Sequence, residues 1–392
     1  MAWNEYFRAL RRVKGLRGAL SIICIGTLYC FFWGLVSPIF NIRINEITGS
    51  LALSGIMFGI WGLVTMIFDI PFGILCDKFG AKKLLRAALA AYIFITLAYV
   101  YVNDVLSLLL LRIIHSTFGA LYWVSLWTLI RSVPREYEEE EVNLYTVSSS
   151  LGGLFAPFLG SLLIMYISWK LPFYLLSSSF LLLILLTRRI PDQKIVVRKD
   201  GFKLLSQEMK SFFRRRKTAA GLTLSILATF FTSSIMGSFL PIILNTYGYN
   251  IEDIGIVLTI SGSLPWVLVP ILILPLEEMR EKFSLALGFL LNALGFFLFP
   301  LSKELSSLLV AVFLVNAGGG AINPTINAII GKMARDGERG GYSGLTETLK
   351  DIGILAGNFS GGFLLQYLGV PIFYFLGFSC LITIPFILFL FK

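Results

Sequence analysis

Six ionisable side chains lie inside long apolar stretches of this 392-residue chain, where they could bind a charged solute or carry a proton. A charged side chain in hydrocarbon is costly unless it has a charged partner, a water-filled cavity or a functional role. We therefore expect these residues to act in ligand binding, proton movement or gating. The six are Asp69, Arg112, His115, Glu347, Lys350 and Asp351.

Arg112 and His115 are three residues apart, so on a helix they share one face with Trp123. A permanent cation beside a titratable imidazole can hold an anionic group or respond to a proton. The alternative is an arginine that donates to backbone carbonyls and a histidine that only packs. We expect all three residues to contact substrate and His115 to take part in proton coupling as well, and the alternative stays open.

A second polar stripe lies near the C-terminus, where Glu347, Asp351 and Asn358 follow the spacing i, i+4, i+11 with Lys350 beside them. Two nearby carboxylates with one ammonium titrate as a coupled group, which suits proton-linked gating. A structural salt bridge is the alternative. We expect the two acids and Lys350 to take part in proton coupling, together with Asp69, and Asn358 to line the substrate path.

Uncharged polar and aromatic residues recur at helical spacing in two other segments. Asn316, Asn323 and Asn327 fall at i, i+7 and i+11, and Tyr29 and Trp33 share a face in the first apolar segment. Amides that face a central cavity can bind solute or water, whereas amides that face lipid are costly. We expect all five to contact substrate, with packing and bonds between helices as the alternative.

The elements that carry these side chains are long apolar segments. Hydrophobic residues make up 56% of the chain, charged residues 14%, and the mean hydropathy is +0.81, which leaves too little polar surface to cover a soluble globule. About twelve segments approach or exceed the roughly 20 residues that a spanning helix needs. They are continuously apolar rather than alternating, which predicts helices and not a barrel. The segments are 18–41, 52–76, 84–102, 105–131, 143–167, 171–187, 219–246, 253–275, 283–300, 305–331, 343–368 and 370–391.

Lysine and arginine residues gather in alternate loops between these segments. This asymmetry marks the cytoplasmic side of a membrane protein, so we expect both termini to be cytoplasmic and the first segment to be an uncleaved helix. The net charge of +10 alone would also suit nucleic acid. The placement of the basic residues instead favours a multi-pass protein of the cell membrane.

Neither an enzyme nor a cofactor-binding protein is expected. The four cysteines lie in or at the end of predicted spans without metal-ligand spacing, so we expect no disulfide and no metal site. The sequence has no nucleophile with an oriented base and no phosphate-binding loop, so direct use of ATP by this chain is not expected.

A polar stretch at 188–218 divides the chain into two halves of six predicted helices each. Apolar residues recur in this stretch at helical spacing, which suggests a helix lying flat on the inner leaflet. We predict an N-terminal bundle at 1–187, a linker at 188–218 and a C-terminal bundle at 219–392. The halves match at a shift of about 200 residues, as a duplication would produce. The matching pairs include Gly55 with Gly255, Gly62 with Gly262, Asp77 with Glu277, Lys82 with Lys282, and Gly119 with Gly319.

The run GILCDKFGAKK at 73–83 joins the second and third predicted spans. A tight reversal needs small residues where backbones meet, and charges beside it can hold or release a helix end. The run resembles the loop between helices 2 and 3 of the major facilitator superfamily, G-x-x-x-D-x-x-G-x-[RK]-[RK], at every position. Upstream, FDIPFGILCD looks like the E-x-P-x-G-x-x-x-D variant of several efflux members, with Asp69 in place of the first acid. We expect gating roles for Gly73, Asp77, Gly80, Lys82 and Lys83.

The run GLFAPFLGS from Gly153 resembles the fifth-helix pattern G-x-x-x-G-P-x-x-G-G of the same family, especially its antiporter branch, with Ala156 and Ser161 replacing two glycines. Small residues let helices approach closely, and a proline bends the span. We expect gating roles for Gly152, Pro157 and Gly160.

The resemblance implies an all-α integral membrane protein with about twelve transmembrane helices in two pseudo-symmetric six-helix bundles, which enclose a central cavity and work by alternating access. It points to proton-coupled efflux of a small organic solute. The implied partners are that solute, protons and the lipid bilayer, without nucleic acid or cofactor, and we expect a monomer.

One departure from the family pattern keeps other functions open. The first span lacks the membrane acid that many drug exporters carry. The alternatives are a proton symporter or facilitator that imports an anionic metabolite or sugar and, in another class, a membrane sensor or enzyme that reuses the fold.

Overall fold

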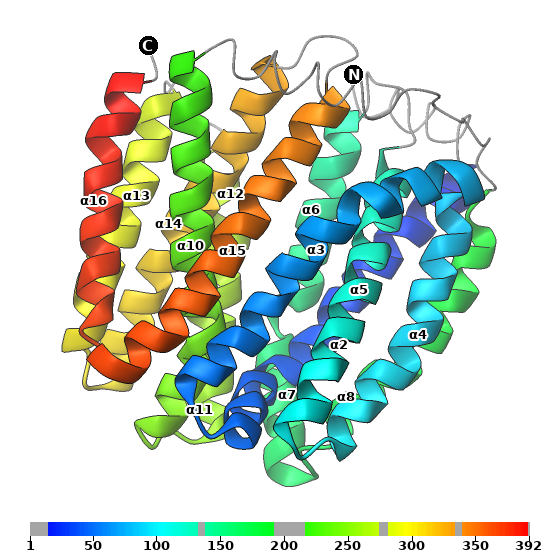
Figure 1. Cartoon of the computed structure of the whole chain (residues 1–392), viewed down its shortest axis with the longest axis horizontal. Coiled ribbons are helices and arrows are strands. Elements are labelled where there is room, and N and C mark those ends of the chain that lie inside the picture. Colours follow the sequence, from blue (N-terminus) through cyan, green and yellow to red (C-terminus); the bar gives the residue numbers. More distant parts are fainter. Residues whose placement is uncertain (1–14, 132–137, 192–215, 274–280, 334–338, 391–392) are drawn as a thin grey trace. The chain divides into compact units, whose positions relative to one another are not determined.

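The computed structural model describes residues 15–131, 138–191, 216–273, 281–333 and 339–390, and in these ranges the regular structure is helical, without strands (Figure 1). Ten helices in these ranges are long and apolar enough to cross a membrane. Several expectations concern residues outside the described ranges. These are the amphipathic linker helix, most of the linker at 188–218, and Glu277 as the counterpart of Asp77.

In the ranges that the structure describes, the first half of the chain forms seven α-helices and one short 3-10 helix. The predicted fifth span, 143–167, is divided at Phe155 into α6 and α7, because Pro157 lies in the first turn of α7 and has no N–H to continue the preceding helix. The elements are α2 (Gly15–Thr48), α3 (Leu51–Phe79), α4 (Ala81–Tyr101), α5 (Val105–Ile130), α6 (Glu138–Leu154), α7 (Ala156–Tyr166), α8 (Leu171–Leu186) and η2 (Thr187–Arg189).

In the described ranges, the second half contains seven α-helices, a π-helix and a 3-10 turn. The predicted span 253–275 is built from α11, the π-helix η3 and α12, and π-helical turns inside membrane helices often mark functional positions. The elements are α10 (Arg216–Thr246), α11 (Ile251–Ile256), η3 (Val257–Ser263), α12 (Leu264–Ile273), α13 (Glu281–Leu298), η5 (Phe299–Leu301), α14 (Leu305–Met333), α15 (Arg339–Leu368) and α16 (Ile372–Leu390).

The turn between α3 and α4 depends on a glycine. Gly80 has a φ of 89°, a conformation that L residues with a side chain adopt only under strain, and its N–H donates to the Cys76 carbonyl at 2.9 Å. The predicted reversal between the second and third spans is therefore found at this residue.

The chain forms two compact units, each built from two separate stretches. Unit 1 comprises Met1–Phe40 and Ile67–Lys199, and unit 2 comprises Asn41–Met66 and Asp200–Lys392, so both α2 and α3 contribute to both units. These units follow contacts and not chain order. The predicted division into 1–187, 188–218 and 219–392 therefore stays a prediction.

Each unit has a core of large buried side chains. In unit 1, α4 packs against α5 and α8 around the fully buried Tyr92, Phe173 and Phe180. In unit 2, α13 packs against both α14 and α16 around Phe289 and Phe373, and Figure 1 shows α13 beside α16. Because lipid is as apolar as these side chains, close packing rather than exclusion from water holds such helices together.

Candidate functional site

Unit 1 holds a continuous group of aromatic side chains around His115, which we call the aromatic cluster. Tyr29 stacks on Tyr122 with ring centroids 4.4 Å apart, and the His115 ring centroid is 5.4 Å from that of Trp33 and 5.5 Å from that of Tyr92. Trp123 meets the edge of Tyr29 at 5.7 Å. The members are Tyr29, Trp33, Phe40, Tyr92, Tyr99, His115, Tyr122, Trp123 and Phe180.

The predicted residues Tyr29, Trp33, His115 and Trp123 are thus brought together. Sequence analysis missed the tyrosines of α4 and α5, although Tyr92 and Tyr99 are seven residues apart and so share a helical face.

Arg112, Tyr99 and His115 lie close together in this cluster, because all three side chains are near the Phe40 ring. The Tyr99 hydroxyl lies 2.9 Å from Nδ1 of His115, and the Arg112 guanidinium lies 5.7 Å from the Phe40 ring centroid. The guanidinium only donates hydrogen bonds, whichever nitrogen of His115 carries the proton.

Small residues bring α6 and α7 into backbone contact with α2. A side-chain carbon on Gly160 would collide with the Leu35 carbonyl, one on Gly152 with the Thr27 carbonyl, and one on Gly34 with Ala156. The predicted gating residues of the fifth span therefore lie where backbones approach closely, and Pro157 is buried beside them.

The predicted gating loop at 73–83 lies at the end of α3 and the start of α4. Asp77 and Lys83 are exposed, whereas Lys82 and Asp69 are half-buried. A side-chain carbon on Gly73 would meet no atom within 4 Å, so the structure shows no packing reason for a glycine there. The backbone conformation therefore favours glycine at Gly80, whereas the packing around Gly73 does not require a small residue.

In unit 2, the amides of α14 fall into two groups. Asn316 accepts a hydrogen bond from the Trp266 indole at 3.1 Å and donates to the Val312 carbonyl, while Asn323 is half-buried and donates to the Gly319 carbonyl at 3.1 Å. Asn327 is exposed. Asn316 is therefore hydrogen-bonded to Trp266, whereas the exposed Asn327 is not part of this pair.

The ionisable residues of α15 have different surroundings. Lys350 Nζ lies 2.9 Å from Glu347 Oε1 and 5.4 Å from the Phe230 ring centroid, which is the salt-bridge arrangement left open as an alternative. Asp351 is 8% exposed and Asn358 is 3% exposed. The Asn358 Oδ1 makes no hydrogen bond within the described ranges.

Within unit 2, the first part of α3 packs closely on α15. A side-chain carbon on Gly62 would lie 2.6 Å from the Asp351 carbonyl oxygen, so the backbones nearly touch at the buried acid. At the start of α3, the Gln366 Oε1 accepts from the Ser50 hydroxyl at 2.7 Å and from the Ala52 N–H at 2.9 Å. Sequence analysis did not identify Gln366.

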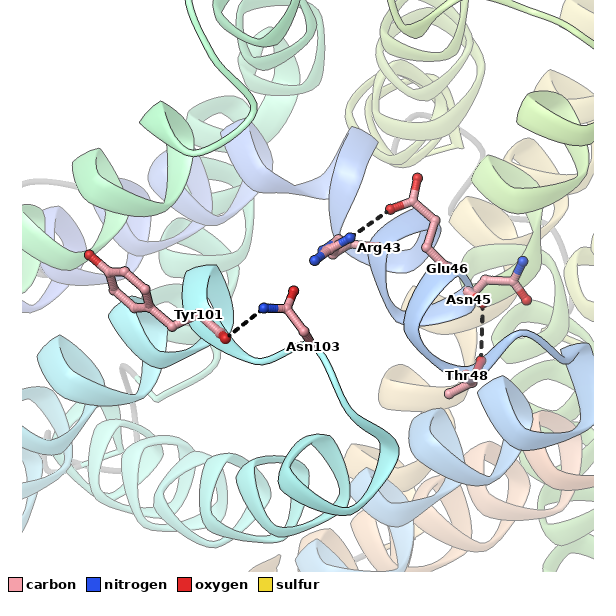
Figure 2. A network of polar contacts seen from close by, with 6 residues as sticks. All are labelled: Arg43, Asn45, Glu46, Thr48, Tyr101 and Asn103. Carbon is pink, nitrogen blue, oxygen red and sulfur yellow. Dashed lines mark hydrogen bonds and ion pairs between the residues drawn. The ribbon is translucent and has the colours of Figure 1, made fainter.

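The last turns of α2 carry their own polar contacts, two of which are drawn in Figure 2. Arg43 Nη1 donates to Glu46 Oε2 at 3.1 Å, and the Thr48 hydroxyl donates to the Asn45 carbonyl at 3.3 Å. The Ser54 hydroxyl of α3 donates to the Asn45 side chain at 3.0 Å. These contacts connect the last turn of α2 to the first turn of α3.

The described residues contain no group of three or more histidine, cysteine or acidic side chains that could hold a metal ion. The four cysteines are free thiols.

A family model described as Major Facilitator Superfamily matches residues 22–273 and 222–392. The chain belongs to the major facilitator superfamily. It is 22% identical over 351 residues to an MFS-type transporter of Methanocaldococcus jannaschii, which covers 87% of this chain and 89% of that relative. It is 24% identical over 362 residues to the multidrug resistance protein MdtG of Escherichia coli, over 86% of each chain.

Solved structures of two transporters share the fold of this major facilitator protein. The nucleoside transporter NupG has a TM-score of 0.76 at 15% identity and covers 95% of this chain and 99% of its own. The xylose transporter XylE of E. coli has a TM-score of 0.71 at 14% identity, covering 95% of each. The predicted all-α membrane fold is confirmed, and this facilitator is a multi-pass secondary transporter of a small molecule and not an enzyme.

Proposed function

We propose that this transporter exports a small organic solute in exchange for protons, by alternating access. The observation that carries the proposal is Asp351, a buried carboxylate on a membrane helix whose backbone touches α3 at Gly62. Adding or removing one proton there changes the charge at a close helix contact, so proton binding can be linked to movement of that contact. The nearby Glu347–Lys350 pair adds two further charges on the same helix.

Two further observations support export rather than import. The glycine and proline contacts between α2 and the helices α6 and α7 belong to the segment that resembles the antiporter branch. The relative MdtG is named a multidrug resistance protein. We place the protein in the cell membrane as a monomer. Both termini lie in the cytoplasm in this proposal, because basic residues gather in the loops on the same side as the termini.

The other proposed site residues divide between the two units. In unit 1, Tyr29, Trp33, Arg112, His115 and Trp123 contact the solute. In unit 2, Asn316, Asn323, Asn327 and Asn358 do so. The residues that act in gating belong to unit 1 and are Gly73, Asp77, Gly80, Lys82, Lys83, Gly152, Pro157 and Gly160. Asp69 and His115 are the secondary candidates for carrying the proton.

The test is solute-driven proton movement in proteoliposomes that hold the full chain and a pH-sensitive dye. A panel of anionic, neutral and cationic aromatic solutes is supplied from outside, with the pH gradient imposed in either direction. We expect solute and protons to move in opposite directions, and we expect Asp351→Asn to abolish proton movement while solute exchange continues. Glu304→Gln, which removes an exposed acid at the start of α14, is the matched control.

Movement of solute and protons in the same direction would show that the protein is a symporter and not an antiporter. A buried guanidinium, Arg112, is the observation that favours this second candidate, because it could bind an imported anion. Proton movement at the wild-type rate in Asp351→Asn would show that Asp351 does not take part in proton coupling.

A further inference from the structure

The buried polar groups of unit 1 include one permanent cation. Arg112 is 4% exposed and its guanidinium carries five N–H groups, and the half-buried indoles of Trp33 and Trp123 each add one N–H. Among the acids of unit 1 whose side chains the structure describes, none is buried, whereas the buried Asp351 belongs to unit 2. This half of the transporter therefore presents positive charge and N–H or O–H groups.

Arg112 is the permanent cation beside Tyr99 and His115. Its guanidinium lies 5.7 Å from the Phe40 ring centroid, and the Tyr99 hydroxyl lies 2.9 Å from Nδ1 of His115. A guanidinium carries N–H donors and no acceptor. A ligand group that accepts hydrogen bonds suits this arrangement, and an ammonium group does not.

The partly exposed members of the aromatic cluster are flat surfaces. The Trp33 and Tyr29 rings are parallel to within 2°, with centroids 6.4 Å apart, and Trp123 stands edge-on to Tyr29. Trp33 and Trp123 are half-buried, whereas Tyr29 and Tyr122 beneath them are buried. Planar ring systems pack favourably on such side chains.

We propose that the transported solutes are aromatic monocarboxylates. Arg112 supplies the positive charge that selects an anion over a cation of the same shape, because charges interact strongly across a low-dielectric interior. Trp33, whose ring centroid lies 5.2 Å from that of Phe40 and 5.4 Å from that of His115, packs on the aromatic ring. This inference rests on the proposed transport of a small organic solute, in whichever direction the solute moves, and adds the charge and shape of that solute.

The test compares ligands of one shape and three charges on the purified full chain. Benzoate, salicylate and indole-3-acetate are each matched with their neutral amide and with the corresponding amine, and binding is measured by ligand-induced thermal stabilisation. We expect the carboxylates to bind at least about ten-fold more tightly than the matched amides, as a charge-assisted hydrogen bond provides, and the amines to bind most weakly.

Variants then separate a charge effect from a packing effect. In Arg112→Gln, carboxylate affinity should fall about ten-fold while amide affinity changes less than about two-fold, because the lost interaction is with the anionic charge. Arg43→Gln is the matched control, since it removes an arginine that is partly exposed and paired with Glu46. If Arg112→Gln does not fold, the comparison of carboxylates, amides and amines on the wild-type protein is the test of the proposal.

The outcomes distinguish this inference from the proposed function. Equal or tighter binding of the amines, or absence of carboxylate binding, overturns the inference even where proton-coupled export of a cation is measured. Carboxylate binding that depends on Arg112, without transport under any imposed gradient, supports the inference and overturns the proposed function.

Discussion

Gly55 of α3 and Gly362 of α15 lie in backbone contact: a side-chain carbon built on Gly55 would be 2.9 Å from the Gly362 Cα, and one built on Gly362 would be 2.8 Å from the Gly55 Cα. Small residues at such a contact let two membrane helices pack by van der Waals attraction. The same helices meet again at Gly62 and at the Gln366 hydrogen bonds. The α3–α15 contact thus depends on several residues that are far apart in the chain.

Gly55→Ala should lower the stability of the protein by about 1–3 kcal/mol, because the methyl group overlaps the α15 backbone and forces the helices apart. Gly73→Ala is the matched control on the same helix. Its methyl group meets open space, so it should be neutral or slightly stabilising, as alanine is in a helix interior. Thermal unfolding of the detergent-purified variants measures both, and equal melting temperatures would contradict the close contact.

Gly80→Ala should destabilise the turn between α3 and α4 by about 1–2 kcal/mol, because an L residue is strained at its φ of 89°. The position has open space around it, so the loss comes from backbone conformation and not from a clash. Gly237→Ala, at a helical glycine with equally open surroundings, is the control. A melting temperature that is unchanged in Gly80→Ala would show that the turn adopts another conformation.

Tyr99→Phe should destabilise unit 1 by about 1–3 kcal/mol, because it leaves the buried Nδ1 of His115 without the hydroxyl that lies 2.9 Å away. Tyr101→Phe, two residues later on the same helix at a side chain that is 67% exposed, should have little effect. The measurement is again thermal unfolding, with Tyr99→Phe also scored for carboxylate binding. A neutral result at Tyr99 would indicate that His115 has an equivalent partner elsewhere.

Asp104, just outside the predicted span of α5, should contribute a pH-dependent stabilisation. Its side chain accepts from the Ser107 N–H at the start of the helix, and these hydrogen bonds hold the pKa of the carboxyl below its ordinary value of 3.8. A lowered folded-state pKa stabilises the protein above pH 3.8, and this contribution disappears as the pH falls through the folded-state pKa.

The melting temperature of Asp104→Ala should therefore differ most from that of the wild type near neutral pH, and the difference should shrink in acid. Asp104→Asn keeps the acceptor for the Ser107 N–H but does not titrate, so its difference from Asp104→Ala should be independent of pH. A gap between Asp104→Ala and the wild type that stays constant down to acid pH would contradict the assignment.

The positions of the membrane helices could be predicted from sequence because hydropathy is a local property. Ten described helices match predicted spans, and the turn at Gly80 follows from a residue type that tolerates its backbone conformation. The division of the fifth span at Phe155 and the π-helix at Val257–Ser263 did not follow from hydropathy, because both change the backbone without changing the apolar composition.

The sequence by itself determined the class of protein, the spans, the resemblance to a transporter family and the few ionisable residues within the apolar segments, since these depend on composition and spacing along the chain. Only the tertiary structure decided which side chains meet: Tyr99 with His115, Tyr122 with Tyr29, Trp266 with Asn316, and Gln366 with Ser50. It also separated Glu347, paired with Lys350, from the buried Asp351 one turn away. These relationships arise from packing between helices that are distant in the chain, and periodicity within one helix carries no information about its neighbours.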